Sequence, residues 1–138
     1  MKLVKQEDDF GCGAACVASI LKRSYQDTLD LFENGKNRAR IEGFYCGEIV
    51  TVLNSNNLVY EFKYIKPSIQ RRIHKAGTIV FIKRSKKYPF GHYLLRTEKG
   101  WMDPWINFPQ KKIKAGFRTK IPGKPIYAIL NPDYIIKQ

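Results

Sequence analysis

The N-terminal third of the chain spaces its apolar residues as helices do. Small and apolar residues from Gly13 onward surround nearly every side of a helical projection, so the first helix is expected to be buried. The next stretch places Leu29 and Phe32 on one face, which is typical of an amphipathic helix. We predict helices at residues 13–23, 25–33 and 47–55, with a basic, glycine-containing connection at residues 35–43.

After the polar cluster at residues 54–57, apolar and β-branched residues alternate with polar ones, as in strands. Pro67 suits the first turn of a short helix, predicted at residues 68–75. Strand-like runs lie at residues 59–65, 78–83, 92–97 and 125–130, with a weaker one around Trp101 that follows a hairpin turn at residues 98–100. Helices first and an antiparallel sheet second indicate an α+β fold, in one domain over residues 1–138.

Charge is divided unevenly between the two halves of the chain. Residues 1–62 hold 7 Lys/Arg against 9 Asp/Glu, and residues 63–138 hold 18 against 3, so nets of −2 and +15 give the total of +13. Six of the basic residues fall in residues 110–124, which we expect to form an exposed hairpin or loop. This half either binds an acidic protein, nucleic acid or anionic membrane surface, or is simply a solvated basic surface.

Cysteine usage and hydropathy argue against a secreted or membrane-spanning protein. Three cysteines are an odd number for a disulfide framework, and no Cys/His pair follows Cys12 and Cys16 at a zinc-site spacing, so no structural metal is expected. The longest apolar run, residues 14–21, is too short to span a bilayer. The N-terminus turns acidic where a secretory signal would be apolar, so we expect a cytoplasmic protein without a transmembrane segment.

Cys12 is the residue with the clearest chemical potential. It lies between two glycines where the first helix begins, so its thiol faces unpaired N–H groups and the positive end of the helix dipole, which favour a thiolate. His92 and Asp103, far downstream, complete a possible set of nucleophile, base and orienter. The alternatives are structural: a small buried Cys12, a strand-edge His92 and a turn-forming Asp103.

Taken together, these motifs resemble a known family. Gln6 lies six residues before Cys12-Gly13, which opens a buried helix; Gly91-His92 begins a strand, and Asp103-Pro104 follows the next turn. This layout resembles the C39-like peptidases of the papain-like cysteine peptidase group, over about residues 5–130. The chain departs from the family in having Gly11 before the cysteine, where many members have aspartate, and in its short connection from His92 to Asp103.

The resemblance implies a papain-like fold, with the nucleophile on a central buried helix packed on an antiparallel sheet. It implies Cys12 as nucleophile, His92 as general base, Asp103 as orienter and Gln6 as an oxyanion donor beside the N–H of Cys12. No metal or cofactor is required. We also expect four residues to border the substrate: Gly11, Gly91, Trp101 and Trp105. The two tryptophans either shield the triad from water by packing or include one that lines the cleft.

The sequence therefore favours a cysteine peptidase that cleaves a peptide or protein through a Cys12 thioester. A related enzyme that conjugates or deamidates uses the same groups and is not distinguished by sequence. The alternative from another class is a catalytically weak peptidase fold that binds an acidic protein or nucleic acid through its basic half. Known C39-like peptidases cut leader peptides after two glycines; whether this chain does so is left open.

Overall fold

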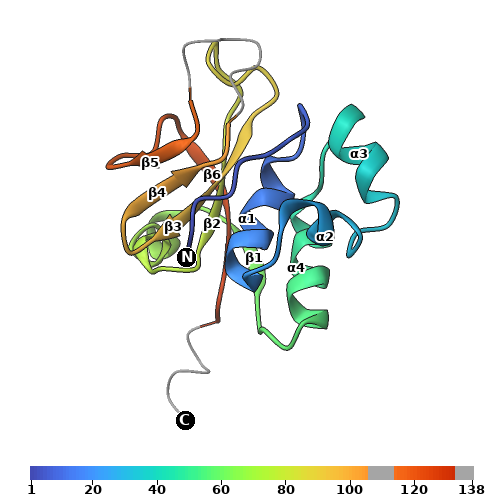
Figure 1. The fold of residues 1–138 in the computed structure, drawn as a ribbon. Helices are drawn as coiled ribbons and strands as arrows, with labels where there is room; N and C mark the ends of the chain where they lie inside the picture. Colours follow the sequence, from blue (N-terminus) through green and yellow to red (C-terminus); the bar gives the residue numbers. More distant parts are fainter. Residues whose placement is uncertain (106–113, 133–138) are drawn as a thin grey trace.

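The computed structural model describes residues 1–105 and 114–132, and a six-stranded sheet lies at its centre (Figure 1). Neighbouring strands in the order β1-β6-β2-β3-β4-β5 are antiparallel. The strands are β1 Glu61–Tyr64, β2 Ile79–Ile82, β3 His92–Thr97, β4 Gly100–Asp103, β5 Gly116–Arg118 and β6 Pro125–Leu130. The predicted strands at residues 92–97 and 125–130 therefore have the expected bounds.

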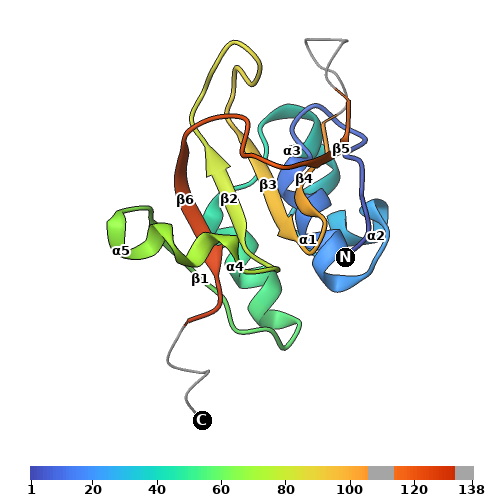
Figure 2. The same ribbon diagram turned by 90° about the vertical axis from the view of Figure 1, so that its left-hand side faces the viewer.

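Helices lie on both faces of this sheet. One face is covered by the N-terminal group, α1 Cys12–Leu21, α2 Tyr25–Leu29, α3 Gly35–Ile41 and α4 Cys46–Ser55. The opposite face carries the short helix α5 Pro67–Gln70 and a 3-10 turn at Arg72–His74 (Figure 2). This mixture of helices and antiparallel sheet confirms the α+β prediction, with α1 as its buried central helix. None of the described helices is long and apolar enough to cross a membrane.

Two apolar cores result, one on each face of the sheet. Alternation along β3 sends Tyr93 and Leu95 into the core beneath α1 and Leu94 into the core on the α5 side. Helix α1 is buried along its whole central part, from Gly13 to Ser19, as its apolar composition predicts. Because each fully buried aliphatic side chain contributes about 1.5–3 kcal/mol, these contacts fix the position of α1 against β3.

The predicted connection at residues 35–43 is wrong, because most of it is the helix α3. Asn34, the residue before α3, adopts a left-handed conformation (φ 54°) that turns the chain into this helix. Gly35 is needed at this turn because a Cβ there would lie 1.9 Å from the carbonyl oxygen of Leu29. The helix shows no apolar period because it buries only Gly35 and Ala39, and Arg38 anchors it by ion pairs with Glu42 and Glu48.

Other elements also differ from the prediction, and several, such as α1, β1 and β2, do so by one or two residues at an end. Helix α2 ends at Leu29 instead of residue 33, and the predicted helix at residues 68–75 is divided into α5 and the 3-10 turn. Within the basic segment 110–124, expected to be an exposed hairpin or loop, Gly116–Arg118 is the strand β5, which pairs antiparallel with β4. Residues 110–113 of that segment lie outside the described residues.

Candidate active site

Cys12 is the first residue of α1, and its thiol is half-buried where this helix meets β3. The backbone N–H of Tyr93 donates a hydrogen bond to Sγ at 3.4 Å. The first N–H groups of a helix have no partner within it and carry the positive end of its dipole. The sulfur thus lies at the positive end of the helix dipole and accepts a hydrogen bond from β3.

Gly11 is required by packing at the start of α1. A Cβ at this position would lie 1.8 Å from the hydroxyl oxygen of Tyr25, and that hydroxyl donates to Asp8 at 2.9 Å. Any larger residue would displace the buried Tyr25 ring from this contact. The departure from the family pattern before the cysteine is therefore explained by the position of Tyr25.

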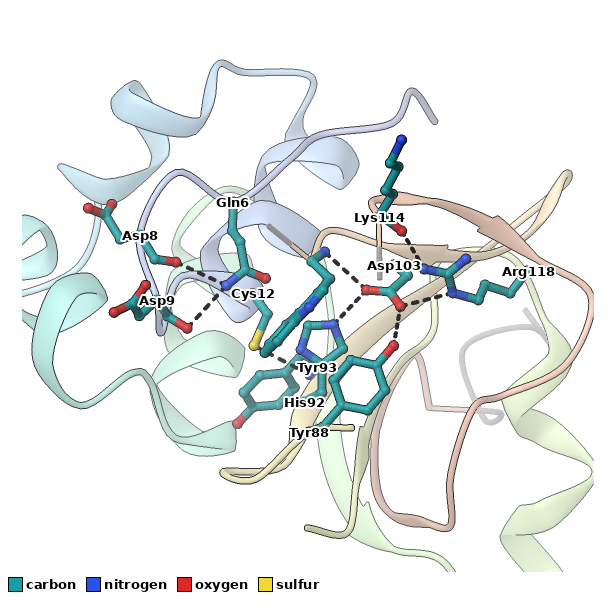
Figure 3. Close-up of polar contacts among 11 residues, drawn as sticks. Gln6, Asp8, Asp9, Cys12, Tyr88, His92, Tyr93, Asp103, Lys114 and Arg118 are labelled. Carbon is teal, nitrogen blue, oxygen red and sulfur yellow. Dashed lines mark hydrogen bonds and ion pairs between the residues drawn. The ribbon is translucent and has the colours of Figure 1, made fainter. Parts of the chain in front are cut away.

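The β3–β4 hairpin places His92 beside Asp103. Leu95 pairs with Met102 across the hairpin, so a tight turn returns the chain and the start of β3 meets the end of β4. His92 Nε2 lies 2.7 Å from Asp103 Oδ1, and both side chains are buried (Figure 3). The short connection between these residues is thus sufficient to pair them.

The other ring nitrogen of His92, Nδ1, is directed to the cysteine side. It makes no hydrogen bond of ordinary length within the described residues. Burial alone would lower the pKa of His92, but the charge of Cys12, the hydrogen bond to Asp103 and a polar contact with Cys12 raise that pKa to about 9. A pKa in this range favours the charged imidazole at neutral pH, next to the carboxylate of Asp103.

Asp103 is fully buried and accepts four hydrogen bonds, two on each oxygen. Oδ1 accepts from His92 and from the backbone N–H of Trp105 at 3.0 Å. Oδ2 accepts from the hydroxyl of Tyr88 at 2.5 Å and from Nε of Arg118 at 3.0 Å. Burial would raise the pKa of Asp103, but the bonds and charge of His92 with the Tyr88 and Trp105 bonds lower it to about 2. The carboxylate is thus ionised.

Tyr88 and Arg118 also belong to the site, although neither was predicted from the sequence. Tyr88 lies in the segment between β2 and β3, and Arg118 on β5, within the basic segment expected to be surface. No local pattern marks either residue, because each meets Asp103 through a contact fifteen residues away along the chain. The sequence offers a weak signal for Tyr88 alone, which is an aromatic residue at the end of a polar, basic stretch.

Gln6 is buried close to Cys12 (Figure 3). Its side-chain Nε2 donates to the carbonyl oxygens of Asp8 at 2.9 Å and Asp9 at 3.2 Å, whereas Oε1 has no partner among the described residues. Its backbone N–H donates to the carbonyl oxygen of Pro104 at 2.9 Å, which ties this strand of chain to the residue after Asp103. Gln6, expected from the sequence to belong to the site, thus lies beside Cys12 in the fold.

The four expected substrate-border residues divide into two groups. Trp105 and Gly91 line the small cleft at Cys12 and His92, and the Trp105 ring packs edge-on against His92 at 5.1 Å. Trp101 is buried in the core on the α5 side, against His74. Neither Trp101 nor Gly11 is among the described residues that line this cleft. For Trp101 the packing interpretation therefore holds.

The cleft at Cys12 opens beside a larger groove. The cleft itself measures about 60 Å³, and the adjoining groove about 680 Å³. Both are bordered by Phe10, Phe44, Phe81, Phe90 and Tyr93. Exposed apolar side chains continue the groove away from the cysteine, namely Ile41, Tyr45, Phe62 and Tyr127.

The other two cysteines lack the surroundings of Cys12. All three cysteines are free. Cys16 is fully buried, and burial raises its pKa well above the ordinary value. Burial also raises the pKa of Cys46, whose sulfur lies 3.6 Å from the hydroxyl of Tyr93. Across the described part of the chain, no group of His, Cys, Asp and Glu side chains is arranged to hold a metal ion.

Comparison with known proteins supports the fold. No family model matches the chain, and no curated protein matches it. A solved structure with a similar fold is the peptidase domain of Streptococcus ComA, a bi-functional ABC transporter involved in a quorum-sensing pathway. The TM-score is 0.54 at 21% sequence identity, and the match covers 94% of this chain and 96% of that domain. The expected papain-like fold of a C39 peptidase domain is thereby confirmed.

Proposed function

We propose that this protein is a cysteine peptidase that cleaves a peptide bond through a thioester on Cys12. The observation that carries the proposal is the buried His92, whose Nε2 lies 2.7 Å from Asp103 Oδ1 and which lines the same cleft as Cys12. A thiolate at a helix N-terminus beside an imidazolium is the activated form that cysteine nucleophiles use. The similarity in fold to a peptidase domain supports the same reaction class.

In the first step, the Cys12 thiolate attacks the substrate carbonyl carbon, and the carbonyl oxygen becomes an oxyanion. His92 then gives its Nδ1 proton to the leaving amine, the C–N bond breaks, and a thioester with Cys12 remains. In the second step, water attacks the thioester while His92 takes a proton from it. The acid product leaves, and Cys12 returns to the thiolate. Asp103 stays ionised throughout and keeps Nε2 protonated.

Two donors are available to the oxyanion. One is the backbone N–H of Cys12 at the first turn of α1, and the other is the side-chain Nε2 of Gln6. Nε2 donates to two carbonyl oxygens, and its bond to Asp9, at 3.2 Å, is longer than its bond to Asp8. We expect this bond to yield to the oxyanion in the transition state.

The shape of the site supports an extended substrate with apolar side chains. The cleft of about 60 Å³ at Cys12 accommodates only a small side chain next to the cleaved bond. The groove of about 680 Å³, with its exposed aromatic rim, offers contacts to apolar residues farther along the peptide. A peptide or protein substrate with a small residue before the cleavage site therefore fits best.

The experiment combines labelling with product analysis. A thiol-directed electrophile and a library of peptides with small residues at the cleavage site are applied to wild type, C12A, C16S and C46S. We expect C12A to lose labelling and cleavage, whereas C16S and C46S keep both, because burial raises the pKa of those two thiols. Mass spectrometry of the products separates hydrolysis from transfer to an amine. Equal labelling of C12A and wild type would refute the proposal and favour a binding module.

A further inference from the structure

We propose that Tyr88 and Arg118 are positioning residues, which together hold Oδ2 of Asp103 so that Oδ1 orients His92. This inference rests on the proposed function, because it assigns how the base of that reaction is held. The two residues come from different parts of the chain, the segment before β3 and the strand β5, and converge on one carboxylate oxygen (Figure 3).

Tyr88 contacts both members of the His92–Asp103 pair. Its hydroxyl donates to Oδ2 of Asp103 at 2.5 Å, and its ring stacks on the His92 imidazole with centroids 4.4 Å apart and planes at 13°. The side chain is 1% exposed, and the edge of the Trp105 ring packs against it at 5.1 Å. One rigid side chain thus fixes the plane of the imidazole and the rotation of the carboxylate.

Arg118 reaches the same oxygen from the other side. On β5 it pairs with Trp101 of β4, and its side chain extends along this face to Asp103, two residues farther on β4. Its Nε donates to Oδ2 at 3.0 Å, and a terminal nitrogen donates to the carbonyl oxygen of Lys114. A fixed positive charge therefore lies next to the carboxylate, on the side away from His92.

The hydrogen-bond pattern explains why both donors are needed. A carboxylate rotates about its Cβ–Cγ bond, and either oxygen accepts a hydrogen bond equally well. Two donors on Oδ2 leave Oδ1 for His92 and the Trp105 N–H and remove the freedom to exchange the oxygens. Because one remaining donor still restrains Oδ2 in part, whereas the loss of both leaves it free, the two residues should act non-additively.

The test uses Y88F, R118M and the double variant. Y88F keeps the ring that stacks on His92 and removes only the donor, and R118M keeps much of the stem and removes the charge and the donor. The matched control is K120M, which removes the same charge from an exposed position of the same segment. The conservative variant R118K retains the charge next to Asp103.

We expect each single variant to lower kcat about tenfold, the loss typical of one hydrogen bond to a buried charged group. The double variant should fall below the product of the two single effects, and K120M should match wild type. R118K should recover part of the loss. Additive effects, or single variants with wild-type kcat, would overturn the proposal.

A second readout does not depend on turnover. The chain has only two histidines, so NMR titration in a C12A background, with H74Q for assignment, isolates His92. The titratable groups in contact with this imidazole are then Asp103 and Tyr88, and Arg118 binds the far oxygen of Asp103. R118M and Y88F should raise the pKa of His92, because each removes positive potential beside the carboxylate. A purely structural role would lower the unfolding temperature and leave this titration unchanged, which would overturn the proposal even if wild type proved inactive.

Discussion

Replacing Asp103 with Asn gives the sharpest test of the buried charge at this site. The amide has the shape of the carboxylate but carries no charge, and its NH₂ group cannot accept hydrogen bonds. Asp103 accepts from His92 and Trp105 on one oxygen and from Tyr88 and Arg118 on the other. Whichever way the amide turns, one of these donor pairs therefore faces another donor.

The size of the effect follows from burial and from the pKa. Removing one member of a buried pair costs about 3–5 kcal/mol. Arg118 keeps 30% of its side chain exposed and can turn to solvent, so we expect about 3 kcal/mol at pH 7. The pKa of Asp103 falls from 3.8 to about 2, so its ionisation contributes about 2 kcal/mol above pH 4. That contribution is lost as the pH falls through 2.

Urea unfolding at pH 7 and pH 3 measures both quantities in wild type and D103N. The difference in the free energy of unfolding should be about 3 kcal/mol at pH 7 and should narrow by about 1 kcal/mol at pH 3. D27N is the matched control, because Asp27 is exposed in the first turn of α2. A difference below about 1 kcal/mol at pH 7, or one that does not change with pH, would refute the reasoning.

Three further predictions follow from particular contacts. G91A should lower the free energy of unfolding, measured in urea, by about 1–3 kcal/mol, because Gly91 has φ +76° and a Cβ there would lie 2.3 Å from the Phe81 ring. G116A is the control and should change this free energy little, because a Cβ at Gly116 meets no atom within 4 Å. Y45S should raise KM several-fold without lowering kcat, because Tyr45 lines the groove and is 72% exposed. V59S is the control and should leave KM unchanged, because Val59 is exposed but lies outside the groove lining. Equal KM values for the two variants would argue against substrate binding in the groove. The free energy of unfolding of wild type should fall as the pH rises from 6.5 through 9, because the raised pKa of His92 stabilises the fold only while the imidazole is charged, and H92Q should lose this slope.

Local pattern was sufficient for the elements that are buried in the apolar cores. Alternation along β3 and the apolar composition of α1 each reflect a dense core, so these elements have the predicted type. Helix α3 was not predicted, because it buries only two small residues and has no apolar stripe. The ion pairs of Arg38 hold it in place instead. The spacing of apolar residues cannot indicate a helix that is held by ion pairs and turns.

Some residues of the candidate site could likewise be predicted from local sequence patterns, and others could not. Cys12, His92 and Asp103 each adjoin a local signal, a helix start or a strand end beside glycine or proline. The partners that hold Asp103, by contrast, are set by strand pairing between β4 and β5 and by the path of the segment before β3. Trp101 and Trp105 flank Asp103 equally in sequence, but only Trp105 reaches His92, because Trp101 points into the core on the α5 side. Which of the two tryptophans lies beside His92 can be told only once the register of the sheet is known.

The most direct test of the central claim is the rate of Cys12 alkylation as a function of pH, followed by mass spectrometry in wild type and H92A. H74A is the control, because His74 is exposed on the 3-10 turn. If His92 holds the proton of the pair, wild type and H74A should react at pH 6 nearly as fast as at pH 8. H92A should slow roughly tenfold per pH unit below pH 8, as an ordinary thiol does. Identical profiles in wild type and H92A would contradict the account.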